Sequence, residues 1–405
     1  MAQPDPPLHV VVVNYVYDGD LASAQQALER YFLLTGWSAG LLAAGARVTV
    51  IGRLGQDATI EHEGATYRFV ADGHAPWLRR GQVPRRLHRV VRACCAEAVA
   101  SGERAVVHVN GLLFPLATRF LAATLSRALP GRAWAVVAQH HAEAPWHGLA
   151  RSLQRWGLGR VDGFFFAARD LADEWVTQGS IRRLDVVHEV MEASSPFRYE
   201  ERAAARARTG LAGDPVVLWT GNLTANKDPL TILAGFERIL ERLPRARLYM
   251  AYRYADLLPE VEARIAAGEK LCSAVTLLGK IPHAEVASYY NSADVFVQGS
   301  AREGSGLALL DAIACGAVPV VTGIPSFRTI TGGGRIGALW RPGDVDGFVR
   351  AFLEVAGQPL ALLADQARAF SEETWSAAAV GRRAAAAYGE ILRVRSGAPR
   401  PGAAQ

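Results

Sequence analysis

Short, continuous runs of apolar residues separated by helical segments constrain the fold of this chain more than any other feature. They include HVVVVN at 9–14, AVVHVN at 105–110 and AWAVVA at 133–138. A strand that is apolar at every position is buried on both faces, as in parallel sheets covered by helices. We therefore predict an α/β fold with doubly wound parallel sheets.

The same alternation occurs twice along the chain. A turn-like stretch and a charged, alanine-rich segment at 193–213 interrupt it, and strand-like runs then resume at 216–219, 246–252, 295–298 and 318–321. We predict two Rossmann-like domains, 1–192 and 193–372, followed by a helix over 373–394 and a disordered tail over 395–405. Because α/β folds bind ligands at the carboxyl ends of their strands, we expect the site in a central cleft between the two domains.

Composition narrows the class of protein. The chain has 405 residues and a formal net charge of +5, with no apolar run long enough to span a bilayer and no basic segment at the start. Its four cysteines lack disulfide or zinc spacing, so we expect a cytoplasmic protein. The arginine clusters at 79–80, 85–89 and 182–183 are either solvated helix faces or a surface for peripheral contact with the inner face of a membrane or with an anionic acceptor. They are not interleaved with aromatic residues, so we expect no nucleic-acid partner.

The segment AREGSGLALLDAIACGAVPVV at 301–321 carries the clearest candidate site. Glu303 and Asp311 flank a glycine turn and an apolar helix. Free N–H groups at a helix start attract phosphate, and carboxylates can bind sugar hydroxyls, so the pattern indicates a nucleotide sugar. The residues of this candidate donor site are Arg302, Glu303, Gly304, Ser305, Gly306, Leu307 and Asp311.

A second candidate is the loop GNLTANKD at 221–228, between a strand and a helix. Gly221 allows close backbone approach, and the ammonium group of Lys227 would face a diphosphate. The alternative is an ordinary polar turn with a solvated lysine. In the first domain, His140 and His141 end one predicted strand, and His108 and Asn110 end another. These histidines lack the i, i+4 spacing of a metal pair, so we expect no metal site.

These segments resemble the retaining glycosyltransferases of the GT-B fold that are often called family 4. REGSGLALLDAIACGAVPVVT is similar to the donor-binding signature of that family, and WTGNLTANKDPLTILAGF to its phosphate loop. The clear resemblance covers about 216–392, and the tail with Trp375 and Tyr388 is similar to the closing helix that crosses back to the first domain.

The resemblance implies retaining, metal-independent hexosyl transfer from a nucleoside diphosphate sugar, with no cofactor. The acceptor would be a sugar, a lipid-linked molecule or a small molecule. Glu303 would bind donor sugar hydroxyls, Lys227 would neutralise the leaving diphosphate, and His141, or else His140, would lie near the reacting sugar. Asp311 would bind the ribose where the family usually has glutamate, and the N–H groups of residues 305–307 would hold the diphosphate.

Two departures from the family pattern concern the phosphate and acceptor contacts. Asn222 stands where the family often has arginine, so Arg302, Arg328 or Lys280 would have to supply that charge. The loop that begins at Asn14 lacks the paired glycines of the family, so we place Asn14 on the acceptor side together with His108, Asn110 and His140.

Two other functions stay open at this stage. One is a nucleotide-sugar epimerase or hydrolase of the same fold, and the other is a nucleotide-sugar-binding protein without transfer activity. The absence of a G-x-G-x-x-G fingerprint after the first strand argues against a nicotinamide dehydrogenase. The sequence does not specify the oligomeric state.

Overall fold

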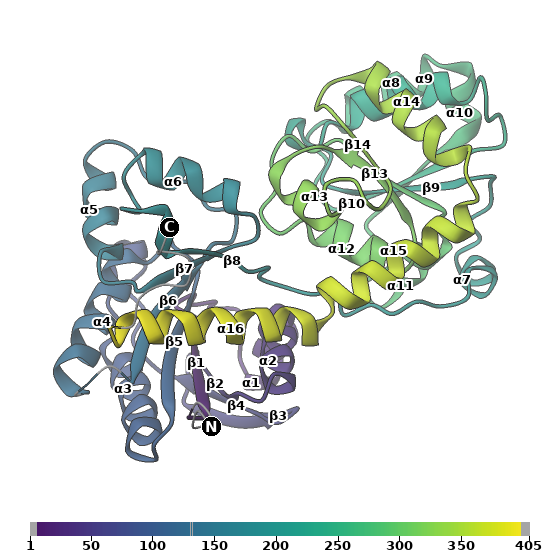
Figure 1. The fold of residues 1–405 in the computed structure, drawn as a ribbon. Helices are drawn as coiled ribbons and strands as arrows, with labels where there is room; N and C mark the ends of the chain where they lie inside the picture. The colour runs from purple at the N-terminus through teal and green to yellow at the C-terminus, as the bar shows by residue number, and fades with distance from the viewer. Residues whose placement is uncertain (1–5, 130, 132, 398–405) are drawn as a thin grey trace, which may run out of the picture. The chain divides into compact units, whose positions relative to one another are not determined.

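The structure is a computed structural model that describes residues 6–129, 131 and 133–397. The chain forms two compact units (Figure 1). Unit 1 comprises residues 1–194 together with 377–405, and unit 2 comprises residues 195–376. Residues 398–405, most of the tail that we predicted to be disordered, lie outside the described residues.

Unit 1 contains an eight-stranded sheet in the order β3-β4-β2-β1-β5-β6-β7-β8, parallel except for β3. The strands are β1 (Leu8–Val13), β2 (Arg47–Arg53), β3 (Ala58–His62), β4 (Ala65–Val70), β5 (Arg104–Asn110), β6 (Trp134–Gln139), β7 (Gly163–Phe166) and β8 (Val187–Glu189). The α-helices are α1 (Ala24–Arg30), α2 (Phe32–Ala43), α3 (Arg85–Ala100), α4 (Pro115–Ala128), α5 (Gly148–Leu158), α6 (Asp173–Thr177) and α16 (Ala377–Arg395). The 3-10 helices are η1 (Pro76–Gly81), η2 (Arg169–Ala172) and η3 (Leu184–Val186).

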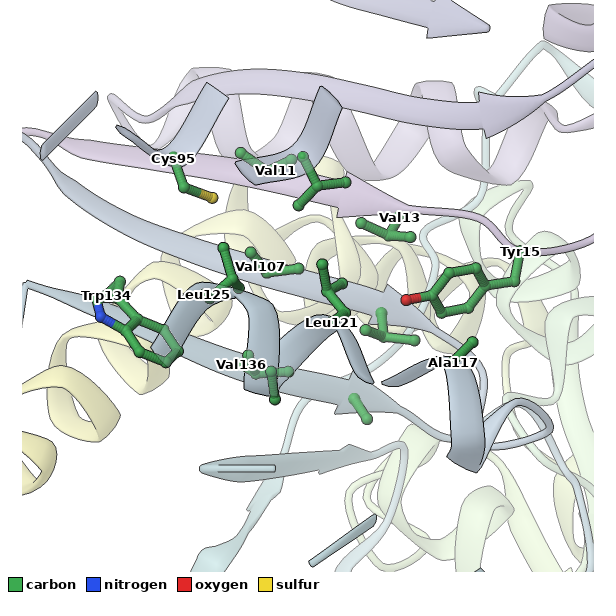
Figure 2. Close-up of a cluster of buried hydrophobic side chains, with 14 of the residues drawn as sticks. Val11, Val13, Tyr15, Cys95, Val107, Ala117, Leu121, Leu125, Trp134 and Val136 are labelled. Atoms are coloured by element: carbon green, nitrogen blue, oxygen red, sulfur yellow. The ribbon is translucent and has the colours of Figure 1, made fainter. Parts of the chain in front are cut away.

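Helices cover both faces of this sheet. Alternate residues of β1, β5 and β6, including Val11, Val107 and Val136, pack against α3 and α4 (Figure 2). On the other face α16 packs along α2, where a Cβ atom on Gly381 would lie 1.9 Å from the carbonyl oxygen of Gly40. The two helices therefore touch backbone to backbone, which only glycine permits at this crossing.

Unit 2 contains an all-parallel six-stranded sheet in the order β11-β10-β9-β12-β13-β14. The strands are β9 (Val216–Gly221), β10 (Arg247–Tyr252), β11 (Val275–Gly279), β12 (Val295–Gln298), β13 (Val318–Thr322) and β14 (Ala338–Trp340). The helices are α7 (Arg202–Thr209), η4 (Ala225–Lys227), α8 (Pro229–Ile239), α9 (Leu258–Ala266), α10 (Glu269–Ala274), α11 (His283–Ser292), α12 (Leu307–Ala314), α13 (Pro325–Ile330), α14 (Val345–Ala356) and α15 (Leu360–Trp375). The predicted α/β class with two doubly wound parallel sheets is confirmed.

Some local predictions differ from the structure. The helix over 373–394 is two helices, because Ser376 is extended (φ −60°, ψ 154°) between α15 and α16. The strand β3 was not predicted, since its residues alternate between half-buried and exposed and lack a continuous apolar run. Among the described residues, no single helix combines the length and apolar composition needed to cross a membrane, although one sharply bent pair, Val345–Ala356 with Leu360–Arg395, does so when taken together.

Candidate functional site

In unit 2 the predicted phosphate loop and the 301–307 loop lie against each other. The Lys227 ammonium donates a hydrogen bond to Oε1 of Glu303, and both side chains are largely buried, with 18% and 15% exposed. The stem of Lys227 passes over Gly221, whose Cβ would lie 3.5 Å from Lys227 Cδ. The lysine stem therefore runs alongside Gly221, and the two charges predicted for the donor site lie in direct contact.

Asn226, which sequence reasoning missed, fastens these two loops together. Its Nδ2 donates to the carbonyl of Arg302 at 3.0 Å, and its Oδ1 accepts from the N–H of Arg302 at 3.1 Å. Its carbonyl also accepts from the N–H of Ala301 at 2.8 Å. The next residue, Asp228, has a left-handed backbone (φ 44°, ψ 58°) and caps α8 through the N–H of Thr231. The only sequence signal for Asn226 is its place in the polar loop.

The glycine turn before α12 requires glycine at one position. Gly306 has φ +61°, and a Cβ there would meet Ile330 Cδ1 at 2.8 Å. Within the described part of the chain, the N–H groups of Ser305, Gly306 and Leu307 find no protein acceptor. These donors stand at the positive end of the α12 dipole, so the turn can bind an anion.

Asp311 lies further along α12 and is held by a residue that sequence reasoning missed. Ser195 Oγ donates to Asp311 Oδ1 at 2.7 Å. Burial raises the pKa of Asp311 to about 7, partly offset by this hydrogen bond. Near neutral pH the side chain is therefore partly protonated and can donate as well as accept a hydrogen bond.

Asn222, which stands at the family arginine position, is engaged within unit 2. Its Oδ1 accepts from the N–H of Tyr254 at 3.3 Å. Of the three cations considered as replacements, Arg302 and Lys280 are exposed, and Arg328 donates to the carbonyl of Gly323. Lys227 is a cation that contacts Glu303 directly.

In unit 1 the loops after β5 and β6 are joined by Glu143, which was not predicted. One carboxylate oxygen accepts from the N–H of Leu112 at 2.9 Å and the other from the N–H of His141 at 2.5 Å. His141 Nε2 in turn donates to Asn110 Oδ1 at 2.5 Å. Two residues that were predicted separately, His141 and Asn110, are therefore in direct contact.

The other ring nitrogen of His141 meets a buried carboxylate. Nδ1 contacts Oε2 of Glu192, which lies just after β8 in a segment that the sequence marked only as a turn. Burial lowers the pKa of His141 to about 4, and Glu143 opposes this shift. Glu192 thus places a buried carboxylate against the imidazole ring of His141.

A cavity of about 150 Å³ opens beside this pair within unit 1. Its apolar wall comes from the α1–α2 region and its polar wall from the strand ends. The lining residues are Arg30, Tyr31, Phe32, Leu33, Leu34, Trp37, His108, Asn110, Gln139, His141 and Glu192. The cavity thus combines an aromatic side with hydrogen-bonding groups, which suits a ligand with both apolar and hydroxyl surface.

The remaining predicted residues of unit 1 have structural contacts. His140 is buried and stacks on Phe166 with ring centroids 4.6 Å apart, away from the residues that line the cavity. His108 lines the cavity, but its Nδ1 is bonded to the Tyr388 hydroxyl at 2.7 Å, and burial lowers its pKa to about 3. Asn14 lines a separate, smaller pocket. Among the described residues, no three metal-ligating side chains come together.

The comparisons with known proteins bear on this geometry. The family model described as "Glycosyl transferases group 1" matches residues 214–358, which contain Lys227, Glu303 and Asp311. This segment is similar to the glycosyl transferases of group 1. The likeness confirms the family resemblance that the two loop motifs carried.

A curated relative and two solved structures extend the comparison beyond residues 214–358. The chain is 31% identical over 207 residues to a D-inositol 3-phosphate glycosyltransferase of Thermobispora bispora, and this match spans about half of each chain (48%). Sucrose-phosphate synthase from Thermosynechococcus elongatus has a TM-score of 0.65 at 18% identity and covers 95% of this chain and 99% of its own. Anabaena Alr3699/HepE in complex with UDP and glucose has a TM-score of 0.64 at 13% identity, covering 93% and 98%. These likenesses show that the fold is GT-B.

Proposed function

We propose that this protein is a retaining glycosyltransferase that moves a sugar from a nucleoside diphosphate sugar to an acceptor hydroxyl. The observation that carries the proposal is the contact of Lys227 with Glu303, held beside Gly221 and the start of α12 in the segment that the group 1 family model matches. A cation, a carboxylate and free N–H groups at one place match the diphosphate and the sugar of such a donor.

In this proposal the N–H groups of residues 305–307 bind the diphosphate, and Lys227 turns from Glu303 toward it. As the bond to the sugar breaks, negative charge grows on the leaving diphosphate, and these donors stabilise that charge. Glu303, released from the lysine, accepts hydrogen bonds from donor sugar hydroxyls. Because lysine and backbone N–H groups supply the positive charge, we propose that transfer needs no metal ion and no cofactor.

The acceptor side of the proposal rests on unit 1. His141 would contact the reacting sugar or the acceptor hydroxyl, with its ring fixed by Asn110 and Glu192. The adjoining cavity would take the acceptor, a sugar, a lipid-linked molecule or a small molecule. All four cysteines are free thiols, which fits catalysis in a reducing compartment such as the cytoplasm. Contact with a membrane is a separate proposal and depends on another surface of unit 1.

The first experiment tests the donor site. A panel of nucleoside diphosphates and their sugars is screened by thermal shift, since a ligand raises the melting temperature in proportion to ln(1 + [L]/Kd). The donor found in this way is then incubated with candidate acceptors, and the anomeric configuration of the product is read by NMR. We expect Glu303→Ala and Lys227→Ala to abolish transfer while the protein stays folded.

The control is Lys270→Ala, which removes the lysine of an exposed pair with Glu241 (3.5 Å) in the same unit. Its turnover should equal that of the wild type. Full turnover by either site variant would refute the role of that residue. An epimer or free sugar formed without acceptor would instead indicate an epimerase or hydrolase, and tight donor binding without any product would indicate a binding protein.

A further inference from the structure

Helix α5 exposes most of its large apolar side chains. Its inner face, Gln154, Gly157 and Leu158, is buried in unit 1 but includes a polar and a small residue. Leu149, Leu153 and Trp156, spaced i, i+4 and i+7, form an apolar stripe that is open to solvent, and Leu149 is 92% exposed. A helix that only covers a core turns its apolar stripe inward, so this outer stripe calls for a separate explanation.

Helix α4 extends this outer stripe. The ring of Phe120, which is 47% exposed, lies against Trp156 with centroids 6.4 Å apart. The two helices are tightly packed, since a Cβ on Gly157 would lie 2.5 Å from Pro115. We call the four residues Leu149, Leu153, Trp156 and Phe120 the α4–α5 ridge. It is a solvent-exposed apolar surface on a tightly packed helix pair.

Arginines surround one end of the ridge. The Arg119 guanidinium lies 3.9 Å above the Trp156 ring and donates to the Trp156 carbonyl at 2.7 Å. Desolvation lowers the pKa of Arg119, and so do the nearby charges of Arg160 and Arg182. Arg182 also lies against Gly159 at the end of α5. Arg160 and Arg182 therefore both repel Arg119.

This repulsion is not relieved by the protein itself. Within the described ranges, Arg119, Arg160 and Arg182 have no carboxylate within ion-pair distance. Neither α4 nor α5 contains a single Asp or Glu, although α5 adds the exposed Arg151 and Arg155. An external anion would relieve the repulsion, and it would lie next to exposed leucine and tryptophan.

We propose that the α4–α5 ridge docks the protein on an anionic lipid bilayer. Leucine and tryptophan would enter the boundary between headgroups and acyl chains, and the arginines would bind lipid phosphates. A bilayer fits these observations because exposed apolar residues lie beside arginines, and neither helix carries an acidic residue. The helix η1 also contacts α4 and carries the exposed Trp77 and Leu78, which would enlarge the contact. This inference goes beyond the proposed function and does not depend on it.

Vesicle sedimentation with the full chain tests the proposal. One set of vesicles contains phosphatidylcholine alone, and the other contains equal parts of phosphatidylcholine and phosphatidylglycerol. We expect binding to the mixed vesicles that weakens with added salt, and little binding to phosphatidylcholine. Leu149→Ser with Leu153→Ser should weaken binding about ten-fold or more, and so should Arg160→Glu with Arg182→Glu.

Matched controls lie on unit 2. Leu362→Ser removes an exposed leucine, and Arg245→Glu with Arg350→Glu reverses two exposed arginines that have carboxylate partners. Equal losses in the ridge and control variants would overturn the proposal, as would vesicle binding that ignores lipid charge. A third outcome would also overturn it: the protein binds no vesicles but self-associates, and the double variant Leu149→Ser with Leu153→Ser abolishes the self-association. That result would assign the ridge to contact with a second copy of the chain.

Discussion

The contact between Lys227 and Glu303 allows a quantitative test that needs no substrate. We consider Lys227→Met, Glu303→Gln and the double variant. The side chains are 18% and 15% exposed, so the pair lies between a surface ion pair, worth about 0–1 kcal/mol, and a fully buried one, whose disruption costs about 3–5 kcal/mol.

The two single variants should differ from the double variant. Lys227→Met leaves the Glu303 carboxylate in a largely buried place without its cation, which we expect to cost about 2–3 kcal/mol of stability. Glu303→Gln keeps a hydrogen-bond acceptor for the lysine and should cost about 1 kcal/mol. Because the double variant leaves no unpaired charge, we expect its loss to be smaller than the sum by about 1–2 kcal/mol.

Urea unfolding at neutral pH measures this coupling as shifts of the midpoint at a shared m value. The same cycle on the exposed pair of Lys270 and Glu241, 53% and 61% exposed, is the control and should give less than about 0.5 kcal/mol. Additive losses at Lys227 and Glu303 would refute the contact, and with it the physical basis of the proposed donor site.

Three further predictions concern packing, pH and loop geometry. Gly381→Ala puts a methyl group against the backbone of Gly40 and should destabilise unit 1 by about 3 kcal/mol. Thermal or urea unfolding measures this loss, and an unchanged stability would contradict the close crossing of α2 and α16. The pKa of Asp311 is higher in the folded protein (about 7) than in the unfolded chain, so its contribution to stability is complete below about pH 4 and is lost as pH rises through 7. Asp311→Asn should abolish this loss, which is roughly 2–4 kcal/mol in the free energy of unfolding measured against pH. If the variant leaves the pH slope unchanged, the hydrogen bond from Ser195 keeps the carboxyl ionised. Asn226→Ala removes two hydrogen bonds between the 221–228 and 301–307 loops. It should weaken binding of the proposed donor at least about ten-fold and lower the stability by about 1–2 kcal/mol. Donor binding at full affinity would mean that the two loops keep their shape without these bonds.

Much of this architecture follows from local sequence. Runs such as 9–14 and 105–110 are apolar on both faces, so they become central parallel strands wherever helices can cover them. The glycine turn before α12 is equally local, because the left-handed backbone of Gly306 is set by its own lack of a side chain. This glycine turn belongs to one of the two motifs that carried the likeness to group 1 glycosyl transferases. The strand β3 was not predicted from the sequence, since it depends on its antiparallel partner β4 more than on its own composition.

The contacts that complete the candidate site were decided by the tertiary structure. Two loop motifs and the family resemblance assigned Lys227 and Glu303 to one site, but their direct ion pair joins residues 76 positions apart and depends on how two loops pack. The same holds for Glu192 against His141 and for Ser195 against Asp311. The sequence shows which side chains can carry a charge. Their pKa values and roles depend on their partners and their burial, and these arise only when distant strand ends meet in the folded chain.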